Sequence, residues 1–280
     1  MNIALTAEEV AAGELSPERL QEALQIFADT GIVIIENVYD AEFIQRVRAA
    51  YDVELDRYLE IRGGLEALEG KTFGKNHIGF FPPLFDPIAD EKLAAHPIAV
   101  QLMEQILGSD LQCSFYHTNT ACPGSGIQPV HRDSGHLYTG AAVPHTHNLV
   151  LNVPLCDFTE ENGSTEYWPA SHLIPDADAA ATKNYENRAK HLPSIRLNMK
   201  AGSLALRDLR AWHRGMPNNA DYSRTMFAIV YQRSFLNYKA ITIPQTTWDS
   251  WGEKAQHIFR RNRVVPDDDH RAMTWEEMRG

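Results

Sequence analysis

Apolar residues recur at helical spacing in three segments of the first half of the chain. In the first segment Leu20, Leu24 and Phe27 fall on one face, and Ser16 and Pro17 before them are residue types that begin helices. A glycine after each segment predicts where the helix ends. Equivalent patterns predict helices over residues 40–63 and 97–108.

The pattern changes after Leu111 to short apolar and β-branched runs that are separated by turn residues. Several short strands at this density favour an antiparallel sandwich or barrel. An earlier run, Ile32–Ile35, predicts one more buried strand. The later predicted strands cover residues 113–120, 148–153, 195–199, 203–206 and 225–231.

A single domain is expected for the chain of 280 residues, because no linker or internal repeat divides it. We expect N-terminal helices up to about residue 110, a β core over about 111–235 and a helical tail from Thr247. Two segments fit neither the helical parts nor the β core. Residues 65–95 are predicted to form an irregular loop that is functional or mobile, and residues 176–192 a helical or mobile insert.

Charge and cysteine content exclude several classes of protein. The net charge is −11, with 26 Lys and Arg against 37 Asp and Glu, which argues against nucleic acids and membranes as partners. Three cysteines without a CxxC pair argue against a disulfide scaffold or a thiolate zinc site and suit a reduced compartment. No secretion signal or membrane span is predicted, so we expect a cytoplasmic protein.

A metal site is predicted from His131 and Asp133. Side chains two residues apart on a strand point to the same face, so an imidazole and a carboxylate could bind one ion. His213 is a candidate third ligand. Two histidines and one carboxylate leave coordination positions open, which is typical of non-haem Fe(II) sites that bind a cosubstrate and O₂. Alternative ligands nearby in the sequence are His136, His145 and His147.

Arg224 follows the candidate ligand His213 in the sequence and could bind an anionic cosubstrate. Arg224 stands at the start of an apolar strand and could pair in bidentate fashion with the far carboxylate of a dicarboxylate cosubstrate. Between the predicted ligands lie the segments ENGST at 161–165 and WPASH at 168–172. Taken alone, Arg224 is more typical of an ordinary surface arginine, and the two segments are typical of a plain hairpin turn.

Taken together, the motifs HRD (131–133), NGST (162–165) with WPASH, and WHRG (212–215) with Arg224 resemble the phytanoyl-CoA dioxygenase family of Fe(II)/2-oxoglutarate-dependent oxygenases. The likeness covers roughly residues 20–235. The stretch PGSGIQPVHRD is most similar to the branch that acts on natural products such as fungal meroterpenoids and alkaloids. One departure is WPASH, where the family more often has PGSH.

The resemblance implies a mainly β fold with flanking helices, a double-stranded β-helix or jelly roll. It implies that His131, Asp133 and His213 bind iron and that Arg224 holds the distal carboxylate of 2-oxoglutarate. Gln128 and Thr165 match family positions that contact this cosubstrate. Because Asp133 is present where related halogenases have a small residue, halogenation is disfavoured.

The implied activity is a dioxygenase reaction, most simply the hydroxylation of an unactivated C–H bond in a metabolite or natural product, with release of succinate and CO₂. Members of that branch are often dimers, so a homodimer is an expectation for this chain. Two alternatives remain open, an inactive metal-binding or sensor protein and a zinc hydrolase. Candidate substrate contacts are Lys75, Asn76, His77, His136, Tyr138 and Trp168.

Overall fold

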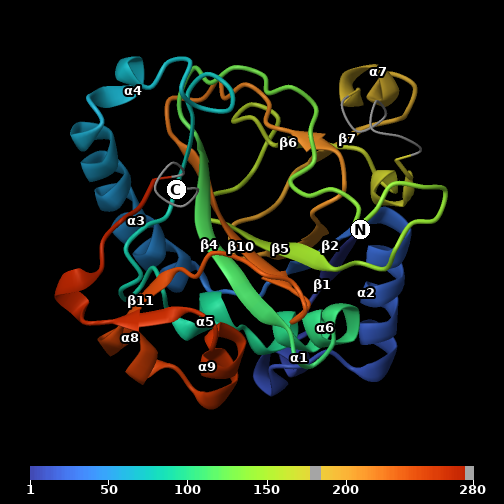
Figure 1. Ribbon diagram of the computed structural model, residues 1–280, viewed down its shortest axis with the longest axis horizontal. Coiled ribbons are helices and arrows are strands. Elements are labelled where there is room, and N and C mark those ends of the chain that lie inside the picture. Colours follow the sequence, from blue (N-terminus) through green and yellow to red (C-terminus); the bar gives the residue numbers. More distant parts are fainter. Residues whose placement is uncertain (177–183, 275–280) are drawn as a thin grey trace.

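Two β-sheets face each other at the centre of the fold, and helices pack on the outer side of the larger sheet (Figure 1). The computed structural model describes residues 1–176 and 184–274. This arrangement is the jelly roll that the family resemblance implies. Among the described residues, no helix is long and apolar enough to cross a membrane.

The strands of the larger sheet are β1 (Asn2–Ala4), β2 (Ile32–Glu36), β3 (His77–Phe80), β4 (Gln112–Ala121), β5 (Asn148–Pro154), β8 (Leu204–Asp208) and β10 (Arg224–Gln232). The strands of the smaller sheet are β6 (Thr165–Tyr167), β7 (Ile195–Leu197) and β9 (His213–Arg214). A separate parallel pair consists of β11 (Thr242–Pro244) and β12 (Arg263–Val265).

The helices are α1 (Ala7–Ala12), α2 (Pro17–Thr30), α3 (Ala41–Ile61), α4 (Gly64–Ala67), α5 (Glu91–Ala94), α6 (Pro97–Leu107), α7 (Tyr185–Ala189), α8 (Gln245–Ser250) and α9 (Glu253–Phe259). Short 3₁₀ turns cover Ser171–Leu173 and Asp267–Asp269.

The strand order of the larger sheet is β1-β2-β8-β5-β10-β4-β3, and that of the smaller sheet is β7-β6-β9. In the larger sheet β10 pairs antiparallel with both β4 and β5 and so forms its middle. The late strand β8 pairs with the early strand β2 on one side and with β5 on the other.

The side chains of the larger sheet alternate between two buried environments. Along β2, Val33 and Ile35 pack in the main core beneath the helices. Ile32 and Ile34 belong instead to a second cluster, which includes Tyr167 of the smaller sheet. Because successive side chains of a strand point to opposite faces, this split defines an interior face between the two sheets.

The predicted helix boundaries are confirmed where the sequence carries local end signals. Ser16 accepts a hydrogen bond from the N–H of Arg19 at the start of α2, and Asp40 accepts one from that of Phe43 at the start of α3. Helix α2 ends at Gly31, whose φ of 81° lies in the left-handed region. A Cβ there would come within 2.6 Å of the His172 ring, so this turn also requires glycine for space.

The N-terminal part differs from a purely helical layer. Strands β1, β2 and β3 all belong to the larger sheet, and β3 lies inside the segment predicted to be an irregular loop. The tail also differs from the prediction, because it contains a strand pair besides α8 and α9. Of the insert predicted at residues 176–192, α7 is helical, and residues 177–183 lie outside the described residues.

Candidate metal and cosubstrate site

His131 and His213 are held side by side by a pair of backbone hydrogen bonds. The N–H of each residue donates to the carbonyl oxygen of the other, at 3.0 and 2.9 Å. His213 begins β9, whereas His131 forms only this isolated bridge. Their ring centroids are 4.3 Å apart, so two imidazoles face one small space.

Asp133 reaches the same space from a bend and not from the strand that the sequence spacing suggested. Its N–H donates to the carbonyl oxygen of Leu209 at 3.0 Å, which fixes the backbone. One carboxylate oxygen lies 3.8 Å from Nε2 of His131, and the other lies 3.6 Å from Nε2 of His213. Among the described residues, these three form the group of potential metal ligands, with all donor atoms within 4.8 Å of one another.

The other ring nitrogens of both histidines have backbone partners. Nδ1 of His131 lies 2.9 Å from the carbonyl oxygen of Pro129, and Nδ1 of His213 lies 3.1 Å from that of Ala211. A carbonyl only accepts, so the proton belongs on Nδ1 in each ring. The Nε2 lone pairs are then free to bind a metal.

The protonation states also suit a cation. Burial lowers the pKa of His131, and burial together with the Arg207 charge holds the pKa of His213 well below its usual value. Partial burial would raise the pKa of Asp133, but its interactions with His213, Arg207 and His131, and the hydrogen bond from Arg207, outweigh this effect and lower that pKa. The site therefore presents neutral imidazoles and an ionised carboxylate, the forms that bind metal ions.

Arg224 is a buried cation without a carboxylate partner among the described residues. It begins β10 on the interior face and is 3% exposed. Its guanidinium stacks on the Phe158 ring, 4.5 Å from the centroid, while Nε and Nη1 make no hydrogen bond to any described residue. Burial lowers the pKa of Arg224 to about 10. Unpaired buried donors are costly, so this pocket fits an anionic ligand.

The two predicted cosubstrate contacts lie differently. Thr165 is 8% exposed on β6 and points to the same side as Tyr167, which is part of the interior cluster. Gln128 uses both ends of its amide within the protein. Its oxygen accepts from the N–H of Gly215 at 2.7 Å, and its nitrogen donates to the carbonyl oxygen of Phe73 at 2.6 Å.

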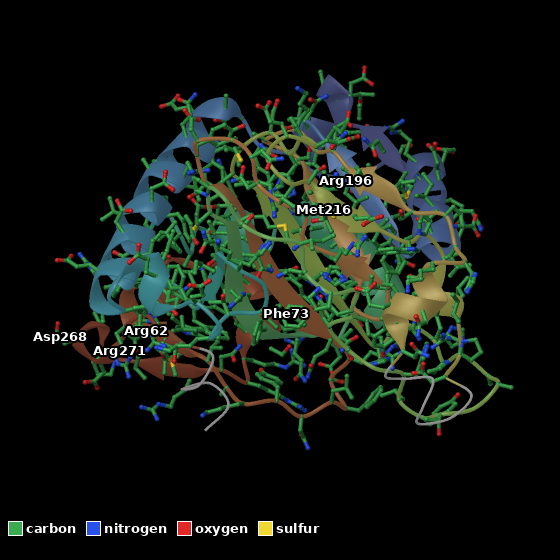
Figure 2. The ribbon with its side chains drawn as sticks, turned by 90° about the horizontal axis from the view of Figure 1, so that it is seen from above. Arg62, Phe73, Arg196, Met216, Asp268 and Arg271 are labelled. Atoms are coloured by element: carbon green, nitrogen blue, oxygen red, sulfur yellow. The ribbon has the colours of Figure 1, made fainter. Side chains whose placement is uncertain are left out.

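Gln128 thereby ties the loop before β3 to the chain just after His213. The loop residue Phe73 lies near the middle of the view in Figure 2, and its ring stands edge-on to His131 with centroids 4.7 Å apart. Phe73 is 54% exposed. An exposed aromatic ring against a metal ligand is a candidate substrate contact that the sequence interpretation did not identify.

His77, in the same loop region, lies within electrostatic reach of both Arg224 and His131. Its Nε2 donates to the carbonyl oxygen of Gly126 at 2.7 Å, and burial lowers its pKa to about 4. Asn76 donates to the carbonyl oxygen of Pro123 at 3.3 Å, and Lys75 is exposed. Of these three predicted substrate contacts, His77 is the one that the structure brings to the site.

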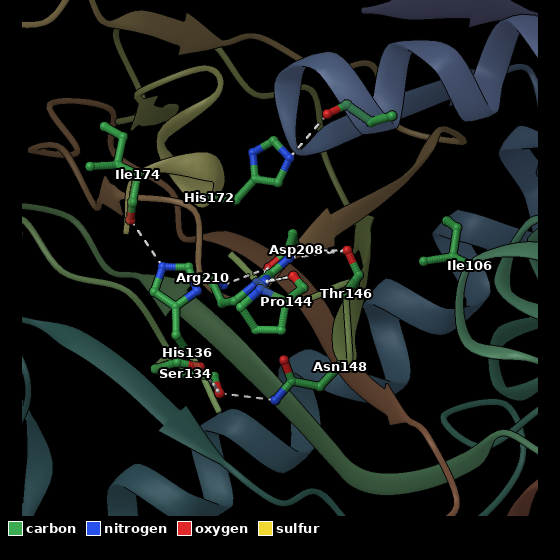
Figure 3. A network of polar contacts seen from close by, with 12 residues as sticks. Ile106, Ser134, His136, Pro144, Thr146, Asn148, His172, Ile174, Asp208 and Arg210 are labelled. Carbon is green, nitrogen blue, oxygen red and sulfur yellow. Dashed lines mark hydrogen bonds and ion pairs between the residues drawn. The ribbon is translucent and has the colours of Figure 1, made fainter. Parts of the chain in front are cut away.

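The other three predicted substrate contacts, His136, Tyr138 and Trp168, have surroundings that differ from those of His77. His136 bonds through Nε2 to the carbonyl oxygen of Ile174 at 3.0 Å (Figure 3). Tyr138 is 54% exposed. Trp168 is 4% exposed, donates from Nε1 to the carbonyl oxygen of Ala189, and packs in a cluster with Val130 and Trp212.

Comparison with known proteins assigns a family to this fold and site. The sequence model of the phytanoyl-CoA dioxygenase family matches residues 27–226. The dioxygenase andF of Emericella variicolor is 21% identical over 224 residues, covering 75% of this chain and 72% of that protein. The multifunctional dioxygenase prhA of Penicillium brasilianum is 23% identical over 254 residues, covering 85% and 81%.

Solved structures show the same fold. The epimerase SnoN from nogalamycin biosynthesis, in complex with Fe³⁺, α-ketoglutarate and its ligand, aligns with a TM-score of 0.59 at 23% identity. That alignment covers 78% of this chain and 85% of SnoN. The carbocyclase SnoK from the same biosynthesis aligns with a TM-score of 0.56 at 19% identity, covering 80% and 86%.

Proposed function

The chain belongs to the phytanoyl-CoA dioxygenase family, and on that premise we propose that it oxidises an unactivated C–H bond of a small-molecule metabolite or natural product. Membership makes it an Fe(II)- and 2-oxoglutarate-dependent oxygenase. Hydroxylation is the outcome we propose, with release of succinate and CO₂. The observation that carries this proposal is a buried Arg224 whose Nε and Nη1 have no hydrogen-bond partner among the described residues, together with a cluster of two histidines and one carboxylate.

The donor set fits the iron and the cosubstrate. His131, Asp133 and His213 would hold the metal and occupy three positions, which leaves the others for ligands. Arg224 would bind the distal carboxylate of 2-oxoglutarate through the two nitrogens that lack partners. When bound, the iron and 2-oxoglutarate together supply the activation of O₂ that oxidation of a C–H bond requires.

The protein shapes the reaction through an apolar wall on the same face. Val150, Leu209, Ala228 and Val230 form a cluster there, and the carbonyl of Leu209 is bonded to the N–H of Asp133. Such a wall excludes water and favours an apolar part of the substrate next to the metal. The roles of SnoN and SnoK in nogalamycin biosynthesis support a natural product as the substrate class.

An anaerobic titration tests the cosubstrate role directly. Adding Fe(II) and then 2-oxoglutarate to the purified protein should produce a weak visible metal-to-ligand charge-transfer band. His131→Ala should abolish the band, and Arg224→Lys, which keeps the charge but loses the planar fork, should require more cosubstrate. Bound iron without a band in the wild type would contradict the proposal and favour the zinc hydrolase or non-catalytic alternative.

The oxidation itself is tested with a panel of apolar natural products. A true substrate should accelerate succinate release and gain one oxygen atom by mass spectrometry. A product that has lost two hydrogens, or that is an isomer of the substrate, would retain the oxygenase assignment and overturn hydroxylation as the outcome.

A further inference from the structure

Arg207 is a buried charge in an otherwise apolar row of the larger sheet. It lies on β8 opposite Val150 of β5 and Ile32 of β2, and Val150 in turn lies opposite Val230 of β10. Arg207 is 5% exposed. A guanidinium in such a place is costly unless it is paired, so its partners indicate why it is there.

The hydrogen-bond partner of Arg207 is Asp133, one of the three predicted metal ligands. Nη2 of Arg207 donates to Oδ2 of Asp133 at 2.6 Å. Nη1 of Arg207 lies 3.2 Å from Nδ1 of His213, which carries its own proton, so this is a close approach of a charge and not a hydrogen bond. The acidic neighbour in sequence, Asp208, is engaged elsewhere. It pairs with Arg210 at 2.7 Å and accepts from Thr146 (Figure 3).

Asp133 needs an external constraint on its side chain. The residue stands in a bend, and its side chain is 37% exposed, so neither strand pairing nor close packing selects a rotamer. The bond from Arg207 fixes Oδ2, which lies 3.6 Å from Nε2 of His213, and leaves Oδ1 3.8 Å from Nε2 of His131. It also balances the charge of the carboxylate.

We propose that Arg207 is a positioning residue of the metal centre, which holds the Asp133 carboxylate through Oδ2 in the space beside Nε2 of His131 and of His213. This inference rests on the metal site of the proposed function and concerns the supports behind its ligands. Groups in this position orient ligands, and their loss typically costs about 10- to 100-fold in metal affinity.

Metal binding by the full-length protein, without 2-oxoglutarate or substrate, tests the proposal. Mn(II) affinity is measured from the electron paramagnetic resonance signal of the free ion, and the ligand geometry from the visible d–d absorption of Co(II). We expect Arg207→Met to weaken Mn(II) binding by about 10- to 100-fold. We expect its Co(II) spectrum to change, because the Asp133 carboxylate is then no longer held through Oδ2.

Two further variants separate positioning from general damage. Arg207→Lys keeps one donor and the charge and should recover most of the lost affinity. Arg210→Met removes an equally buried guanidinium whose bonds go to Asp208 and Pro144, and it should leave the Mn(II) affinity of the folded protein unchanged. Circular dichroism confirms that each variant is folded.

If Arg207→Met binds Mn(II) with an affinity equal to or higher than that of the wild type, the proposal is overturned. The positive charge of Arg207 would then only repel the metal ion and would not help to position its ligand. If Arg207→Met does not fold, Arg207→Lys decides. A Mn(II) affinity and a Co(II) spectrum of Arg207→Lys that are both identical to those of the wild type would also overturn the proposal. A wild type that binds Mn(II) but never forms the 2-oxoglutarate charge-transfer band would contradict the proposed function and leave this inference standing.

Discussion

Glu186 of α7 accepts a hydrogen bond from the backbone N–H of Val130, at 2.9 Å, one residue before the candidate ligand His131. The same helix covers the residue before the other histidine. Tyr185 stands edge-on to Trp212 with ring centroids 5.6 Å apart, and Arg188 lies over the Trp212 ring at 4.7 Å. Helix α7, from the segment that interrupts the strands, therefore braces both histidine-bearing segments at once.

We predict that Glu186→Ala loosens the metal centre. The Val130 N–H would lose its partner, so the free energy of unfolding should fall by about 0.5–1.5 kcal/mol, and Mn(II) should bind several-fold more weakly. Urea unfolding and metal titration measure the two effects. Glu186→Gln retains the accepting oxygen and serves as the matched control. Equal losses in both variants would mean that the charge of Glu186, through Arg214 at 3.8 Å, matters more than the bond to Val130.

Arg224→Met should separate stability from cosubstrate binding. The variant removes a buried cation whose Nε and Nη1 lack partners, so the protein without metal and cosubstrate should unfold at the same or a higher temperature. Its apparent affinity for 2-oxoglutarate should fall about 100-fold, since two charge-assisted hydrogen bonds are lost. Calorimetry and the charge-transfer titration provide the measurements. A clear drop in unfolding temperature would show that Arg224 is satisfied within the protein.

Stability should decline in mild acid, partly because of His270. Its Nε2 accepts from the N–H of Leu84 at 2.7 Å and its Nδ1 donates to Thr242 at 3.0 Å, so the ring is neutral when folded. Burial, opposed by the Asp267 charge, lowers its pKa from 6.5 to about 4. Since the unfolded chain binds the proton first, this contribution is complete above pH 6.5 and is lost as the pH falls towards 4.

Because His270 is partly exposed, we expect its share of that loss to be only about 1 kcal/mol. Urea unfolding of the wild type and of His270→Gln between about pH 7.5 and about pH 4.5 measures this loss. The range spans the ordinary pKa of histidine. The glutamine variant offers an oxygen to Leu84 without a titrating ring and should show a shallower dependence. Parallel curves for the two proteins would exclude His270 as the source.

Gln128→Ala should release the loop that carries Phe73. Both amide contacts, to Gly215 and to Phe73, would be lost, and the exposed residues Lys71 and Lys75 flank the freed segment. Limited trypsin digestion should cut there faster than in the wild type. Cleavage at an unchanged rate, together with weaker binding of 2-oxoglutarate, would instead support the cosubstrate contact that the family resemblance implies for Gln128.

The parts of the fold that follow from local signals could be predicted from the sequence. The caps at Ser16 and Asp40 and the glycine at position 31 act within a few residues, so the ends of α2 and α3 are where the sequence places them. Strands β1 and β3 have three and four residues and exist because distant strands pair with them. Such short runs carry no periodic pattern of their own.

In the candidate site, too, the sequence predicts some features and not those that depend on distant contacts. The spacing of His131 and Asp133 predicts that their side chains lie together, and they do, but for a different reason. Backbone bonds to His213 and Leu209, not a common strand, bring them together. Arg207 could not be identified from the sequence, since its role depends on the register of β8 against β5. Its one local sign is a charged residue in the middle of the apolar strand Leu204–Asp208.

The place of β10 in the middle of the larger sheet has a consequence for the order of assembly during synthesis. Its two neighbours, β4 and β5, are synthesised about 70 residues or more before it. The edge of each strand that pairs with β10 therefore stays unpaired until residues 224–232 emerge. Strand β2 likewise waits for β8. Such non-local pairing slows folding and leaves strand edges open to other chains. The nascent chain should therefore depend on chaperones until the whole of β10, Arg224–Gln232, has emerged.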